Sequence, residues 1–204
     1  MTQVLFFIDR ISTWTGKAFA WCILLLTFAV SYEVFMRYVV RDPTAWAFDV
    51  SYMMYGALFM MGGAYTLSRD GHVRGDFVYR LWPPRVQASI SFVLYFLFFF
   101  PGALALIYAG WDYAWLAIKF RERSIWSPAG MPIYHFKALI PIAGFFLVLQ
   151  GIAETIRCVI CLRDGQWPQR LHDVEEMETA ILHEQEHLAQ LAAETKGEAA
   201  GGAR

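Results

Sequence analysis

The stretch SRDGHVRGDF, from Ser68 to Phe77, concentrates charge in an otherwise apolar part of the chain. Its titratable residues are Arg69, Asp70, His72, Arg74 and Asp76. Carboxylates and an imidazole can bind a metal ion or move protons, whereas arginines can orient a helix pair in a membrane or bind another protein. The two glycines of the stretch suit a turn. A turn with cytoplasmic arginines explains the arginines, but it does not explain the two carboxylates and the histidine.

A second chemical pattern lies near the C-terminus, where HEQEH, His183 to His187, matches the H-E-x-x-H pattern of zinc proteases. On a helix the two histidines would share one face, and Glu184 could act as a general base. A catalytic zinc ion also needs a third protein ligand and a cleft, and the polar sequence around this motif offers neither. We interpret HEQEH as part of a solvated acidic helix and predict no metal site.

A third pattern, CVIC, places Cys158 and Cys161 three positions apart. Membrane enzymes that oxidise thiols need reactive cysteines on the oxidising face, usually with a second pair, and Cys22 is the only other cysteine. We therefore predict small buried side chains here, or at most an acylation site. A bis-histidine haem would need histidines at hydrocarbon depth in two spans. Because His72 and His135 lie beside span ends, we predict no cofactor and no catalytic residue.

The elements that carry these residues are set by long gaps between charges. The chain has 204 residues, of which 57% are apolar and 17% are charged. A helix needs about 20 mostly apolar residues to cross the hydrocarbon core. Four stretches contain no Asp, Glu, Lys or Arg: Ala18–Tyr32, Val50–Ser68, Val86–Trp111 and Ala138–Ala153. The second and third reach this length alone, and the first and fourth reach it if Glu33, Arg37 and Glu154 lie at the membrane interfaces.

We therefore predict an all-α integral membrane protein with four transmembrane helices in a domain that covers residues 17–162. The expected spans cover about residues 18–40, 46–68, 86–111 and 137–160. The second span holds a set of small residues that predicts a close helix contact: Gly56, Gly62, Gly63 and Ala64. Pro101 predicts a kink in the third span. A net charge of −1 gives no reason to expect a nucleic-acid partner.

Both ends of the chain are predicted to lie outside these spans. Residues 1–16 carry apolar side chains at helical spacing, at Val4, Leu5, Ile8 and Ile11. This stripe predicts an amphipathic helix that lies on the membrane surface. Residues 163–204 are acidic and rich in alanine, and we predict that they form a cytoplasmic amphipathic helix with a frayed end.

The orientation is predicted from the distribution of lysine and arginine. If the N-terminus is inside the cell, the inner segments hold nine basic residues: Arg10, Lys17, Arg69, Arg74, Arg80, Arg85, Arg157, Arg163 and Arg170. The outer loops then hold six: Arg37, Arg41, Lys119, Arg121, Arg123 and Lys137. This bias predicts that both termini are cytoplasmic.

Four segments together resemble one family. FMRYVV, DPTAWAFD, GALFMMGGAYTLSRDGHVRGDF and LWPPR are similar to motifs of the small four-span subunit (DctQ-like) of tripartite ATP-independent periplasmic (TRAP) transporters. The similarity covers roughly residues 8–162. The family motifs fall on Arg37 and Tyr38, Trp46 and Asp49, His72 and Asp76, and Pro84 and Arg85. Two positions depart from the family pattern, because Asp49 stands where glutamate is commoner and Gly75 where an apolar residue is usual.

The resemblance implies a division of labour between three proteins. A soluble periplasmic solute-binding protein captures an organic anion, usually a carboxylate, and a large multi-span permease subunit carries it inward with sodium. The small subunit would be a partner of that permease in the bacterial inner membrane, surrounded by lipid, and not an enzyme. Secondary transporters usually build solute sites from interrupted helices in paired repeats, and the spans of this chain lack such a polar centre. This favours a scaffold role; the alternative is a membrane anchor subunit of an oxidoreductase or sensor complex.

Two groups of residues are predicted to serve that role. The first forms the subunit interface or a structural motif: Arg37, Tyr38, Trp46, Asp49, His72, Arg74, Asp76 and Arg85. The second consists of exposed loop charges that help to dock the periplasmic protein: Arg41, Lys119, Arg121 and Arg123. Because Arg37 and Asp49 flank the same outer turn, they could pair with each other or across the interface.

Overall fold

The computed structural model describes residues 2–69, 79, 81–168 and 185. The chain divides into two units, residues 1–171 and 172–204, and every element below belongs to the first. His72, Arg74, Asp76, both histidines of HEQEH and most of the expected tail lie outside the described residues.

The described part of the first unit is helical almost throughout. Its elements are α1 (Thr2–Ala20), α2 (Cys22–Phe35), the π-helix η1 (Met36–Val40), α3 (Ala47–Ser68), α5 (Pro84–Leu94), the π-helix η2 (Tyr95–Phe99), α6 (Phe100–Lys119) and α7 (Tyr134–Asp164). Over the described residues, the only extended pairing is an isolated antiparallel bridge between Arg123 and Pro132. The predicted all-α class is therefore confirmed.

Three helices of the described part are long and apolar enough to cross a membrane: Gln3–Val40, Pro84–Lys119 and Tyr134–Asp164. The fourth expected span, α3, has 22 residues, or about 33 Å at the helical rise. Its tyrosines, glycines and hydroxyl side chains make it less apolar than the other three. It packs against α1, α2 and α7, so part of its surface is covered by protein and not by lipid. Its crossing of the membrane stays a prediction.

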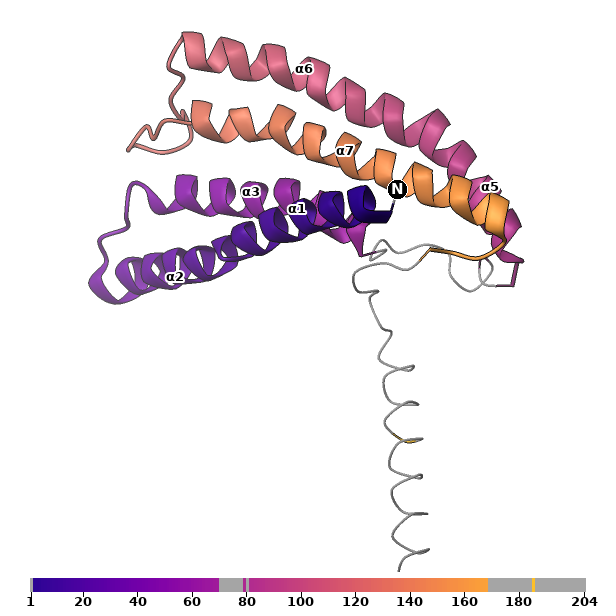
Figure 1. Cartoon of the computed structure of the whole chain (residues 1–204). Coiled ribbons are helices and arrows are strands. Elements are labelled where there is room, and N and C mark those ends of the chain that lie inside the picture. The colour runs from indigo at the N-terminus through magenta and orange to yellow at the C-terminus, as the bar shows by residue number, and fades with distance from the viewer. Residues whose placement is uncertain (1, 70–78, 80, 169–184, 186–204) are drawn as a thin grey trace, which may run out of the picture. The chain divides into compact units, whose positions relative to one another are not determined.

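Helix α1 extends beyond the surface helix that was predicted for residues 1–16. It continues to Ala20, and only a turn at Trp21 separates it from α2, so Figure 1 shows the two helices following one line. The apolar stripe that was expected to face the membrane includes Leu5 and Ile8, which are instead buried against Ala153 of α7. The surface location predicted for residues 1–16 is untested; Leu5 and Ile8 pack against protein, whereas Val4 of the same stripe is exposed.

One irregular point in the helices, the π-helix η2, follows from the sequence. Proline has no N–H group, and its ring clashes with the carbonyl group four residues earlier. For Pro101 that carbonyl belongs to Leu97, which lies in η2, and the wider π-helical turn accommodates the clash. The sequence predicted a kink at Pro101, and the structure shows a π-helix directly before the helix that contains it.

Small residues set the distances between helices, as the second span predicted. Ala64 is buried, and a Cβ atom added at Gly56 would lie 2.4 Å from Cζ of Phe136 in α7. Gly62 is the exception, because a Cβ atom there would meet nothing within 4 Å. The contact between α3 and α7 is therefore confirmed for part of the predicted set.

Small residues also allow close packing between α6 and α7, which lie side by side (Figure 1). A Cβ atom at Gly110 would lie 2.9 Å from Cγ2 of Ile140 and 3.2 Å from the backbone nitrogen of Pro141. A Cβ atom at Gly144 would lie 2.8 Å from Cγ1 of Ile107. In lipid, such close backbone approach is a main source of helix association.

Candidate functional site

The predicted motif residues of the first span lie at one end of the helices, which we call the loop end because residues 41–46 and 120–133 connect helices there. Glu33 and Arg37 lie on the same helix face and form an ion pair. Nε and Nη2 of Arg37 lie 3.0 and 2.6 Å from Oε1 of Glu33. The other carboxylate oxygen of Glu33 accepts a hydrogen bond from the backbone N–H of Thr44 at 3.0 Å and another from its hydroxyl group. This carboxylate therefore ties the turn after η1 back to the helix.

Asp49 does not pair with Arg37, so the direct pair considered from the sequence is not formed. Asp49 lies in the first turn of α3 and is completely buried. Its carboxylate accepts hydrogen bonds from the hydroxyl groups of Ser124, at 2.6 Å, and Ser127. Arg37 is occupied by the nearer Glu33, one helical turn away. Asp49 thus fixes the loop between α6 and α7 and has no exposed surface to offer a partner.

A third polar group at the loop end links α6, the same loop and α7. Nζ of Lys137 lies 2.6 Å from Oε2 of Glu122 and 4.0 Å from the centroid of the Tyr113 ring. The Lys137 side chain is only 10% exposed, so the carboxylate and the aromatic face replace much of its hydration. Lys137 was counted among the outer basic residues, and the structure shows it as an internal partner.

The other predicted residues that the structure describes are exposed. Tyr38 and Arg85 have open surface. Trp46 is partly exposed and stacks on Tyr32 with ring centroids 6.0 Å apart. The four predicted docking residues are exposed in or beside the loops: Arg41, Lys119, Arg121 and Arg123. Arg41 and Arg121 adopt left-handed backbone angles, φ 64° and 48°, which fix sharp turns at both loops.

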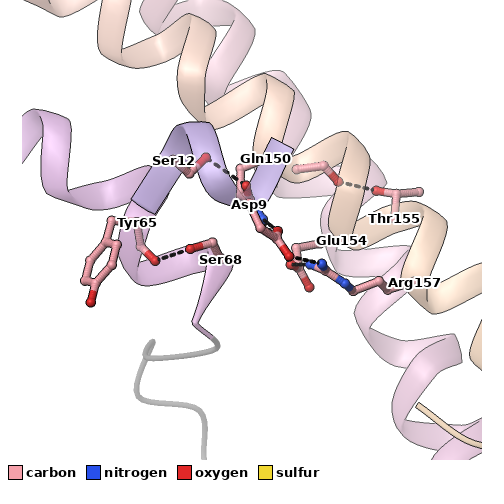
Figure 2. Close-up of polar contacts among 9 residues, drawn as sticks. Asp9, Ser12, Tyr65, Ser68, Gln150, Glu154, Thr155 and Arg157 are labelled. Atoms are coloured by element: carbon pink, nitrogen blue, oxygen red, sulfur yellow. Dashed lines mark hydrogen bonds and ion pairs between the residues drawn. The ribbon is translucent and has the colours of Figure 1, made fainter. Parts of the chain in front are cut away.

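The most extensive buried polar cluster of the described residues was not predicted. It joins α1 to α7 and consists of Asp9, Ser12, Gln150, Glu154 and Arg157, all 1% exposed or less. Figure 2 shows Arg157 reaching from α7 toward both carboxylates. Nη2 of Arg157 binds Asp9, and Nη1 binds Glu154. We call this set the α1–α7 polar network.

Gln150 holds the centre of the α1–α7 polar network. Its Nε2 donates to Oδ1 of Asp9 at 2.9 Å and to Oε1 of Glu154 at 3.3 Å. Its Oε1 accepts a hydrogen bond from the hydroxyl group of Ser12 at 2.8 Å. Because one amide satisfies a carboxylate on each helix as well as the serine, the network fixes the register of α1 along α7.

Burial of these groups is tolerated because the Arg157 guanidinium binds both carboxylates and Gln150 donates a hydrogen bond to each of them. Moving an isolated carboxylate or guanidinium out of water costs several kcal/mol or more, so each charge depends on the opposite one. The structure corrects two readings of the sequence. Glu154 does not lie at a lipid interface as a snorkelling side chain, and Arg157 is not a free positive-inside charge.

The spacing of the network residues along each helix is a signal that the sequence contains. Gln150, Glu154 and Arg157 follow i, i+4, i+7, so they share one face of an otherwise apolar helix. Asp9 and Ser12 stand at i, i+3 on α1. A polar face in an apolar helix requires a polar partner, but no sequence rule identifies a partner more than a hundred residues away.

Both cysteines of CVIC are buried. Sγ of Cys161 lies 3.6 Å from the carbonyl oxygen of Pro84 at the start of α5. Their burial agrees with the prediction of small packed side chains. In the part of the chain that the structure describes, no group of three or more His, Cys, Asp or Glu side chains could hold a metal ion.

A comparison with family models bears directly on identity. The model described as "Tripartite ATP-independent periplasmic transporters, DctQ component" matches residues 26–161, which is 136 of 204 residues. The chain belongs to this family. As a DctQ component it is a small permease subunit of a TRAP transporter and a multi-pass membrane protein, and the family is a transporter family, not an enzyme family. The alternative of an anchor for an oxidoreductase or sensor complex is not favoured. No curated protein matches the chain.

Proposed function

We propose that this DctQ component is the scaffold of its transporter: it holds the large permease subunit in place and does not contact the transported solute. The solute is an organic anion, in particular a carboxylate, which a periplasmic binding protein delivers and the large subunit imports with sodium. The protein lies in the bacterial inner membrane with both termini in the cytoplasm. Sodium coupling and solute class come from the family resemblance.

One observation carries the scaffold proposal. The buried charged groups of the described helices are bound within the chain: Arg157 by Asp9 and Glu154, Asp49 by two serine hydroxyl groups, and Lys137 by Glu122. A solute pathway needs polar groups that are free to exchange partners with the solute. Charged groups that are held by partners inside one chain instead give a rigid body, as a scaffold requires.

The outward surface of the helices supports the same proposal. Large apolar side chains are exposed along the helices, among them Phe28, Tyr38, Phe96, Tyr108 and Trp111. Such a surface is stable only against lipid or against another apolar protein. The exposed motif residues Tyr38 and Arg85 fit the boundary with the large subunit, and His72, Arg74 and Asp76 are proposed to complete it.

Co-expression with the large subunit tests the scaffold role. We expect Asp49→Ala and His72→Ala to lower recovery of the two-subunit complex in detergent, because the first frees the α6–α7 loop and the second removes an interface side chain. Uptake in proteoliposomes should fall in proportion to the complex lost. Arg163→Ala, at an exposed residue of α7, is the control and should change neither. A variant that assembles fully yet transports nothing would show a direct role in transport and refute the scaffold proposal.

A further inference from the structure

The loop end contains a pocket that the scaffold role does not use. Its volume is about 570 Å³, and α3, α6, the α6–α7 loop and α7 line it. Phe48, Phe136 and Ile140 provide apolar walls, while Arg123 and the pair Lys137–Glu122 provide the charges. We call it the loop-end pocket.

The charges of this pocket leave one positive group available. Lys137 and Glu122 neutralise each other at 2.6 Å. Arg123 is exposed, and among the described residues its guanidinium group meets no carboxylate; its Nη1 lies 3.4 Å from the carbonyl oxygen of Gly130. That weak neutral contact leaves most of the guanidinium donors open, so the pocket is complementary to a single anionic group such as a phosphate.

The polarity of the pocket changes along the helix axis. Arg123 belongs to the loop, whereas Phe136 and Ile140 lie in the first turns of the apolar span Tyr134–Asp164. The exposed Trp126 lines the same pocket as Arg123, and tryptophan is enriched at the boundary between headgroups and hydrocarbon. A ligand that fills this space therefore needs a charged end in the loop and an apolar chain along α7.

We propose that the loop-end pocket binds one anionic phospholipid, with its phosphate against Arg123 and an acyl chain along Phe136 and Ile140. The membrane supplies such molecules at high local concentration to any pocket that opens at its surface. This assignment separates Arg123 from the other docking candidates, because Arg41, Lys119 and Arg121 do not line the pocket.

Native mass spectrometry of the complex with the large subunit tests the proposal, with phosphatidylglycerol added in a mild detergent. We expect one retained lipid per small subunit, and on the order of tenfold weaker retention in Arg123→Gln, because one charge-assisted hydrogen-bonding group is lost. Arg121→Gln changes an exposed arginine outside the pocket and should retain the lipid. Equal weakening in both variants would indicate diffuse attraction to basic loops and overturn the proposal.

A second pair of variants tests the acyl chain. Phe48 and Phe59 are both exposed on α3, but only Phe48 lines the pocket. Phe48→Ala should weaken lipid retention several-fold, and Phe59→Ala should not. Equal retention of phosphatidylethanolamine would refute an anionic lipid. Failure of the complex to bind any lipid while the free chain does so would show that the large subunit fills the pocket, which also overturns the proposal.

Discussion

At Arg157, one guanidinium group serves the carboxylates of two different helices, Asp9 in α1 and Glu154 in α7. The cost of removing one partner of a buried pair exceeds the gain from forming it, because the remaining charge is left without water. Removing Arg157 leaves two buried carboxylates without a positive partner, whereas removing Asp9 still leaves the ion pair between Arg157 and Glu154. Loss of Arg157 should therefore destabilise the protein more than loss of Asp9.

We predict that Arg157→Met lowers the free energy of unfolding by about 3–5 kcal/mol, and that Asp9→Asn lowers it by less. The double variant should lose less than the sum, with a coupling of about 0.5–3 kcal/mol between residues in one network. Denaturant or thermal unfolding of the complex in detergent measures all three values.

Arg163→Met is the matched control for this cycle. Arg163 lies near Asp164 at 3.6 Å, but both side chains are exposed, at 87% and 58%, and such pairs contribute about 0–1 kcal/mol. If Arg157→Met were no more costly than Arg163→Met, the α1–α7 polar network would not hold the two helices together.

At the level of elements, the sequence predicts where helices occur along the chain better than it predicts which helices pack against one another. Long apolar runs predict helices regardless of partners, so the all-α class and three spans follow from composition alone. The packing of α1 on α7 does not follow, because the stripe with Leu5 and Ile8 would look the same facing lipid or protein. The hydrogen bonds of Asp49 to Ser124 and Ser127 also depend on a loop position that local sequence does not determine.

The contact between α6 and α7 gives an element-level prediction. Gly110→Ala should destabilise the chain by about 1–3 kcal/mol, because the new Cβ atom would meet Ile140 and the backbone of Pro141 at 2.9 and 3.2 Å. Gly102→Ala on the same helix is the control, since a Cβ atom there meets nothing within 4 Å. Unfolding midpoints of the two variants should differ, and equal midpoints would contradict the close contact of α6 with α7.

At the level of the whole molecule, the orientation of the chain is open to direct test. With an even number of spans and cytoplasmic termini, a cysteine at Arg121 should react with an impermeant thiol reagent from the periplasm. A cysteine at Gln185 should react only after the membrane is opened. The parent chain, with its three native cysteines, gives the background labelling. Labelling of both positions from outside would contradict this orientation.

Docking of the periplasmic protein is a second whole-molecule prediction. Arg41 and Arg121 are exposed on the two loops of the loop end, and exposed charges act mainly on the rate of encounter. The double reversal Arg41→Glu and Arg121→Glu should slow uptake several-fold when the binding protein is limiting, and less when it is saturating. Added salt should shrink the difference. A loss of the same size at both protein levels would argue against docking at these loops.

The distance along the chain between the partners of the α1–α7 polar network has a consequence for synthesis. Asp9 precedes Arg157 by 148 residues, which the ribosome adds in on the order of ten seconds at about 5–20 residues per second. During that interval the first hydrophobic segment can already be inserted, while the guanidinium group that neutralises Asp9 has not been made. A fragment that stops before Arg157 keeps this negative charge unmatched. The pairing of Asp9 with Arg157 therefore distinguishes a finished subunit from an incomplete one, and it makes docking of the first helix one of the last steps of biogenesis.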